Sequence, residues 1–145
     1  MSLKINTGEV MTAMVTPFNE KMEIDFAAAE KLANYLVNNG SDSILVAGTT
    51  GESPTLTHAE EIELLKTVKN AVGNKAKIVV GAGSNCTETA VEMTKKVSDI
   101  GVDAILSVVP YYNKPSQRGL IEHFGKIAKS TDLPIILYNI PGRTG

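Results

Sequence analysis

The stretch SILVAGTTGES (residues 43–53) decides the fold, because an apolar run leads directly into a polar, glycine-rich turn. The run SILVA lacks polar alternation, which is typical of a strand covered on both faces in a parallel sheet. In such sheets ligands bind at the carboxyl ends of the strands, where GTTGES would lie. The stretch therefore predicts a strand of an α/β sheet that ends in a binding loop.

The same arrangement recurs roughly every 30 residues. Apolar, strand-like runs are expected at 9–15, 43–47, 77–82, 104–109 and 134–139. Between them, apolar residues recur at helical spacing over 26–36, 62–72, 91–100 and 120–128. The order β-α-β-α-β-α-β-α-β, with no linker or low-complexity segment, predicts one domain over residues 1–145 with a parallel sheet covered by helices.

Capping residues mark the expected helix boundaries. Asp25 is a candidate N-cap, and the spacings Thr57-x-x-Glu60 and Asn85-x-x-Glu88 fit capping boxes. Glycines follow three expected helix ends, where a left-handed conformation is common: Gly40, Gly73 and Gly101.

Two architectures fit this order, a doubly wound open sheet and part of a (βα)8 barrel. Polar segments follow four of the strands: GTTGES, GAGSN, PYYNKPS and YNIPGRTG. A barrel mouth would gather all four loops around one pocket, whereas an open sheet would leave some of them remote. The distribution favours the barrel.

Composition excludes several classes of function. The net charge of −2 gives no electrostatic reason to expect nucleic acid or an anionic membrane. The first residues, MSLKINTGEVMTAM, lack the apolar middle region of a signal peptide, and no apolar stretch is long enough to span a bilayer. The lone Cys86 cannot form an internal disulfide and is interpreted as a free thiol. These features together favour a cytoplasmic location.

Two nucleotide-binding motifs are incomplete here. VVGAGSNC begins like a dinucleotide fingerprint, but position 86 is cysteine instead of glycine and the segment follows the third expected strand. GTTGES lacks the Gly-Lys-Ser/Thr ending of a P-loop. A nucleotide-binding α/β domain is therefore the less favoured interpretation.

Proton-transfer and carboxylate-binding groups gather at the strand ends. Three of the four tyrosines lie there, and a phenol relays protons when another hydroxyl is in reach. An arginine offers a planar fork suited to a carboxylate, and paired threonines add hydroxyls. The residues concerned are Thr49, Thr50, Tyr111, Tyr112, Tyr138 and Arg143. They predict a site for a small carboxylic acid whose reaction moves protons.

The segments GTTGES, PYYNKPSQRGLIEHF and YNIPGRTG resemble the signatures of the dihydrodipicolinate synthase family, one of the pyruvate-dependent class I aldolases. The resemblance runs from about Val10 to Gly145, essentially the whole chain. The paired threonines favour this family over its relative N-acetylneuraminate lyase. The resemblance implies a (βα)8 barrel, of which this chain would cover the first five strands, and a homo-oligomer built from tight dimers.

The resemblance also implies a reaction: condensation of pyruvate with aspartate semialdehyde, on the route to diaminopimelate and lysine. Thr49, Tyr112 and Tyr138 match the proton-relay positions of the family, and Tyr112 would reach into a neighbouring subunit. Thr50 matches a hydroxyl that contacts the keto acid, and Arg143 matches the arginine that holds the semialdehyde carboxylate. No cofactor and no metal are expected.

Four residues fall at positions of a lysine-binding regulatory site found in some members: Ser53, His58, Asn85 and Tyr111. Thr89, however, stands where lysine-sensitive members commonly carry glutamate, and Glu61 where some carry histidine. The missing carboxylate argues against regulation by lysine.

The family's Schiff-base lysine follows the sixth strand, beyond the five expected here. Lys114 follows a strand, but its polar loop would leave the amine exposed and protonated, and Lys77 opens a strand at the opposite end. The isolated 145-residue chain is therefore expected to be inactive. Unpaired sheet edges would favour self-association, so a half-barrel module whose property is assembly is the non-enzymatic alternative. A related keto-acid aldolase, such as N-acetylneuraminate lyase, is the enzymatic one.

Overall fold

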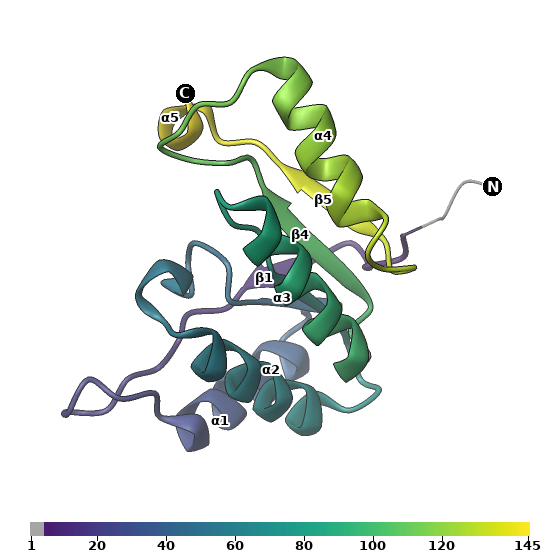
Figure 1. The fold of residues 1–145 in the computed structure, drawn as a ribbon. Coiled ribbons are helices and arrows are strands. Elements are labelled where there is room, and N and C mark those ends of the chain that lie inside the picture. The colour runs from purple at the N-terminus through teal and green to yellow at the C-terminus, as the bar shows by residue number, and fades with distance from the viewer. Residues whose placement is uncertain (1–4) are drawn as a thin grey trace. The chain divides into compact units, whose positions relative to one another are not determined.

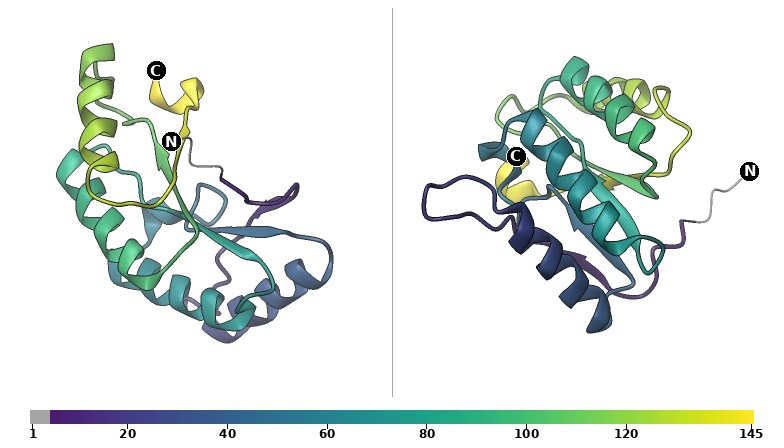
Figure 2. Two further views of the ribbon diagram at one scale, coloured as in Figure 1. Left: turned by 90° about the vertical axis from the view of Figure 1, so that its right-hand side faces the viewer. Right: turned by 90° about the horizontal axis from the view of Figure 1, so that it is seen from below.

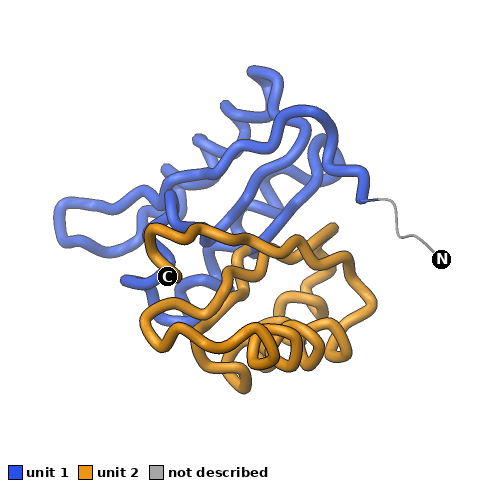
Figure 3. Tube along the Cα trace, turned by 90° about the horizontal axis from the view of Figure 1, so that it is seen from above, with its two compact units in different colours: residues 1–80 blue, residues 81–145 orange. Residues whose placement is uncertain are grey.

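The computed structural model describes residues 5–145, so residues 1–4 of the N-terminal segment considered above lie outside the described part. Strands and helices alternate along the chain, as expected (Figure 1). The chain divides into two compact units, Met1–Val80 and Gly81–Gly145 (Figure 3). The expected single domain over residues 1–145 stays a prediction.

Unit 1 consists of parallel strands and the helices that cover them. Its elements are β1 (Met11–Ala13), α1 (Phe26–Asn38), β2 (Ser43–Val46), the short 3₁₀ helix η1 (Ser53–Thr55), α2 (His58–Val72) and β3 (Lys77–Gly81). Met11 pairs with Ser43 and Ser43 with Lys77, in parallel. Every residue of β2 is buried, and α1 packs against α2 (Figure 2). The run SILVA at 43–47, whose first four residues form β2, is thus a strand covered on both faces.

Unit 2 continues the pattern with α3 (Thr87–Ile100), β4 (Ala104–Val108), α4 (Gln117–Ala128), β5 (Ile135–Tyr138) and the one-turn helix α5 (Pro141–Thr144). Ile105 pairs with Ile135 in parallel, and α3 packs against α4. The Ala82 N–H donates to the Leu106 carbonyl, so the segment that leaves β3 runs beside β4. Strand order therefore follows chain order, from β1 to β5.

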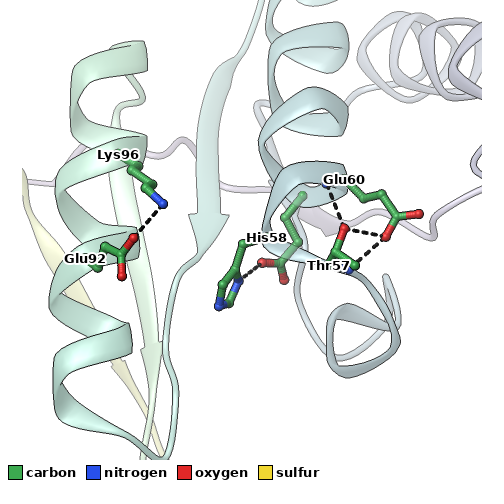
Figure 4. Close-up of polar contacts among 6 residues, drawn as sticks. Thr57, His58, Glu60, Glu92 and Lys96 are labelled. Atoms are coloured by element: carbon green, nitrogen blue, oxygen red, sulfur yellow. Dashed lines mark hydrogen bonds and ion pairs between the residues drawn. The ribbon is translucent and has the colours of Figure 1, made fainter.

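Two predicted helix caps are confirmed. Asp25 Oδ1 accepts the Ala28 N–H at 2.8 Å at the start of α1. Thr57 and Glu60 form the reciprocal capping box of α2, in which Glu60 Oε2 accepts the Thr57 N–H at 2.8 Å (Figure 4). Each cap satisfies backbone donors that the first helical turn leaves unpaired.

The capping box predicted from Asn85 is wrong, because α3 begins at Thr87 and its N-cap is Cys86. The Asn85 carboxamide instead donates from Nδ2 to the Tyr111 carbonyl at 3.3 Å. The Asn85 side chain therefore bonds a carbonyl 26 residues away and does not cap the helix, as its local spacing had predicted.

Three glycines after helices have positive φ, but in different ways. Gly101 is left-handed at φ 82° and ψ 51°, as expected for a C-cap. Gly73 has φ 58° with ψ −125°, which lies outside the left-handed helical region, and Gly40 follows the cap of α1 at φ 101°.

In α4 the predicted apolar face is rotated: His123 is buried, whereas Ala128 is exposed. Among residues 5–145 no helix is long and apolar enough to cross a membrane.

Candidate functional site

In unit 1, the loop after β2 is a pinned turn that presents two hydroxyls. The backbone turns through Ala47, which is buried at φ 52°, and Gly51 N–H donates to the Gly48 carbonyl at 3.1 Å. Thr49 and Thr50 lie at the tip of this turn and are exposed. The hydroxyls predicted as ligand contacts are therefore accessible at the carboxyl end of a central strand.

A hydrogen bond to Gly51 holds the turn against the segment that follows β1. The buried Thr16 Oγ1–H donates to the Gly51 carbonyl at 2.6 Å, and a Cβ on Gly51 would lie 3.1 Å from the Met14 carbonyl oxygen. A side chain here would be tightly packed against the segment after β1, which would have to shift by a few tenths of an ångström. Thr16 escaped sequence reasoning, since the partner of its hydroxyl lies 35 residues away.

The start of α2 carries a histidine–carboxylate pair. His58 Nδ1 lies 2.9 Å from Glu61 Oε2, and the Glu61 side chain is 10% exposed against 54% for His58 (Figure 4). Burial raises the pKa of Glu61, and the hydrogen bond from His58 opposes that rise. Ser53 is the first residue of η1, in the segment that precedes α2, and is half-buried.

In unit 2, the loop after β4 presents Tyr112 in a strained conformation. Tyr112 has φ 72°, and the Asn113 N–H donates to the Tyr111 carbonyl at 2.9 Å across it. An i to i+2 hydrogen bond around a residue with positive φ is the rare, strained form of γ-turn. Tyr112 is 91% exposed, while Tyr111 is 37% exposed. The loop thus directs one phenol into solvent at a conformational cost.

Tyr138 and Arg143 frame the end of β5. Tyr138 is the last residue of the strand, in register with Val108 of β4, and its carbonyl accepts the Val109 N–H at 2.9 Å. Arg143 lies exposed in α5. The buried Thr144 beside it donates to the carbonyl of Ile140, the N-cap of α5, at 3.1 Å, which stabilises this helical turn just after the strand.

Lys114 and Cys86 are the nucleophilic side chains near these loops. Lys114 is exposed, and its stem lies over the last residue: a Cβ on Gly145 would be 2.8 Å from Lys114 Cε. Cys86 is a free, exposed thiol, and hydrogen bonds from the side chain and backbone of Thr89 lower its pKa. Across residues 5–145 no cluster of three or more His, Cys, Asp or Glu side chains could hold a metal ion.

The predicted site residues thus divide between the two units. Unit 1 contains Thr49, Thr50, Ser53 and His58, and unit 2 contains Asn85, Tyr111, Tyr112, Tyr138 and Arg143. Within unit 2, Asn85 is joined to the tyrosine loop by hydrogen bonds that also involve Asn113. Asn113 was missed by sequence reasoning, although its place directly after two strand-end tyrosines was a usable signal.

Comparison with known proteins shows which family has this sequence pattern. The model of the dihydrodipicolinate synthetase family matches residues 6–145. The chain is similar to the 4-hydroxy-tetrahydrodipicolinate synthase of Synechococcus sp. (strain JA-2-3B'a(2-13)), with 57% identity over 141 residues that cover 97% of this chain and 46% of the relative. The chain spans about half the length of the curated relatives it matches.

Solved structures agree with this similarity. The lysine-bound enzyme of Cyanidioschyzon merolae is 56% identical with a TM-score of 0.95, over 98% of this chain and 49% of that one. The enzyme of Acinetobacter baumannii complexed with pyruvate is 43% identical with a TM-score of 0.92, over 94% of this chain and 47% of that one. The α/β fold expected from the sequence, corresponding to about half of a barrel of this family, is confirmed.

Proposed function

The chain belongs to the dihydrodipicolinate synthetase family, and from that premise we propose that it forms part of a lyase that condenses pyruvate with aspartate semialdehyde. The reaction lies on the route to diaminopimelate and lysine. The observation that carries the proposal is the family match over residues 6–145. The A. baumannii relative in complex with pyruvate supports the keto acid as one substrate. We further propose a cytoplasmic homo-oligomer.

Proton transfer is assigned to Thr49, Tyr112 and Tyr138. Phenols and hydroxyls exchange protons along hydrogen bonds without carrying a net charge, which suits a relay between substrate and solvent. The position of Tyr138 at the end of β5 supports a role beside the reacting carbon. The exposure of Tyr112 supports a role in the site of a neighbouring subunit.

Substrate binding is assigned to Thr50 and Arg143. The Thr50 hydroxyl is exposed at the tip of its turn and can donate to a keto-acid carboxylate. The Arg143 guanidinium, exposed in α5 shortly after β5, can pair with the semialdehyde carboxylate through two parallel hydrogen bonds. Arginine suits this role better than lysine because its fork matches a carboxylate in geometry.

The covalent step needs a neutral amine that attacks the keto group, expels water and forms an iminium that withdraws electrons. We assign that role to none of the lysines in the described part of the chain. Lys114 is exposed, and Lys77 opens β3 at the amino end of the strand. The role of this chain is therefore to bind carboxylates and move protons.

Regulation by lysine is not part of the proposal. Ser53, His58, Asn85 and Tyr111 occupy the four positions named above, and the C. merolae relative binds lysine. In this chain, the His58 ring is hydrogen-bonded to Glu61, and the Asn85 carboxamide donates to the Tyr111 carbonyl. With Thr89 in place of a carboxylate, an effector ammonium would lose a charged partner.

A chimera tests the function. The chain is joined after Gly145 to the C-terminal half of the Synechococcus relative, and circular dichroism checks its folding; the two halves are also co-expressed as separate chains. We expect borohydride to trap a pyruvate adduct and condensation activity to appear. Tyr138→Phe should lower kcat by roughly 100-fold or more, whereas Tyr35→Phe, on the exposed surface of α1, should not. A folded chimera that traps pyruvate but cleaves N-acetylneuraminate instead of condensing would overturn the proposal.

A further inference from the structure

The β4–α4 loop has two residues in a strained backbone conformation, and hydrogen bonds hold the first of them. Tyr112 has φ 72° and Lys114 has φ 44°, and neither is glycine. A residue in such a conformation costs about 1–3 kcal/mol and persists only where surrounding contacts hold it. Tyr112 as a residue is 91% exposed, so packing of its ring does not supply those contacts.

Hydrogen bonds to two asparagines supply them. Tyr111 O accepts the Asn113 backbone N–H at 2.9 Å and Asn85 Nδ2–H at 3.3 Å. The Asn113 carboxamide then reaches back, and its Nδ2–H donates to the Asn85 carbonyl at 3.2 Å. These three bonds close a ring around the Tyr111–Tyr112 peptide. Because both carboxamides face carbonyl oxygens, only their NH₂ ends can make these contacts.

The ring joins two loops that are far apart in sequence. Asn85 lies between β3 and α3, whereas Asn113 follows β4, 28 residues later. Both loops lie at the carboxyl ends of their strands, within unit 2. The backbone direction at Tyr112 is thus set by tertiary contacts and not by the loop alone.

We infer that Asn85 and Asn113 form a carboxamide clamp that holds Tyr112 in its strained turn and so positions its phenol for proton transfer. The inference rests on the proposed function of Tyr112. It makes Asn113 a positioning residue, which acts through the tyrosine without touching substrate. It also gives Asn85 a role in holding the turn, in place of the capping role expected from sequence.

The first test measures the clamp itself in the 145-residue chain. Asn113→Asp keeps the side-chain shape but removes the donor to the Asn85 carbonyl. Hydrogen exchange at the Asn113 backbone N–H should then accelerate about tenfold, with little change in Tm. The matched control is Asn70→Asp, the same chemical change on the exposed surface of α2, and should leave that exchange rate unaltered. An unchanged rate in Asn113→Asp overturns the clamp.

The second test measures positioning in the active chimera. Asn113→Asp should lower kcat about 10- to 100-fold with KM for pyruvate unchanged, since small misplacement of a reacting group costs rate. In a Tyr112→Phe background it should lower kcat no further, because both changes act on one phenol. A loss of equal size in both backgrounds, or faster exchange without any change in kcat, overturns positioning. A folded chimera without condensation activity counts against the proposed function, and the exchange test then still decides the clamp.

Discussion

At the scale of single residues, His123 of α4 is a histidine held neutral by its surroundings. The residue is 4% exposed, its Nδ1 lies 2.9 Å from Thr87 Oγ1, and its Nε2 is buried with no partner among the described residues. Burial lowers the pKa of His123 below 6.5, because the charged ring would lose its hydration. The side chain therefore joins α3 to α4 in its uncharged form.

Protonation of His123 makes the free energy of unfolding depend on pH in the mildly acidic range. The folded-state pKa of His123 lies below the unfolded value, so its contribution is complete above pH 6.5 and is lost as pH falls through the folded pKa. We expect the free energy of unfolding to fall by at most about 1.4 kcal/mol per pH unit in that window. Urea unfolding at about pH 7.5 and about pH 5.5 measures it. His123→Leu should remove the difference, and an equal difference in that variant would contradict the assignment.

Burial shifts the pKa of Glu61 in the opposite direction from that of His123. Its folded-state pKa is raised above 4.5, so the ionised carboxylate destabilises the fold above that folded pKa, and the cost vanishes below pH 4.5. Glu61→Gln should raise the free energy of unfolding at neutral pH by up to about 1 kcal/mol, with no gain below pH 4.5. Thermal melts across pH measure this. Glu63→Gln, exposed on the same helix, is the control and should show no such pH-dependent gain.

At the scale of elements, two glycines have opposite reasons to be present. Gly125 lies inside α4, and a Cβ there would meet no atom within 4 Å. Gly83 follows β3, and a Cβ there would lie 2.5 Å from the Val108 backbone nitrogen. The first glycine only weakens its helix, whereas the second permits two backbone segments to approach.

Alanine substitutions should therefore separate the two positions. Gly125→Ala should stabilise the protein by about 0.5–1 kcal/mol, because alanine loses less backbone entropy in a helix. Gly83→Ala should destabilise it by about 1–3 kcal/mol, because the backbone at Val108 must move. Denaturant unfolding midpoints measure both changes. A tolerated Gly83→Ala would show that the two segments separate easily.

At the scale of the whole molecule, apolar side chains remain exposed on or beside the outer strands β1 and β5. In unit 1 they are Val10, Met11 and Val15, which are 50%, 39% and 50% exposed, and in unit 2 Leu137 of β5 is 60% exposed. Exposed apolar groups beside unpaired strand edges favour association. We expect light scattering to show a mass that rises with concentration, and Leu137→Lys to reduce it. A compact monomer at high concentration would contradict this expectation.

Chemical trapping tests the chain as a whole. With pyruvate and borohydride, the 145-residue chain should acquire no stable adduct, because Lys114 beside the predicted site is exposed. Lysines that form Schiff bases are activated by desolvation or by neighbouring groups, and an exposed side chain lacks that desolvation. Intact mass spectrometry measures the adduct, and the chimera serves as the positive control. Labelling of Lys114 would reverse this assignment.

Sequence alone determined the alternation of strands and helices, the capping box at Thr57 and the strand-end positions of Thr49, Tyr112 and Tyr138. These features depend on periodicity and on neighbours a few residues apart, which the chain itself records. Tertiary structure alone decided the strained turn at Tyr112, the diversion of Asn85 from its helix and the burial of His123. The physical reason is that the partners of these groups, such as the Tyr111 carbonyl for Asn85, are brought near only when distant segments pack.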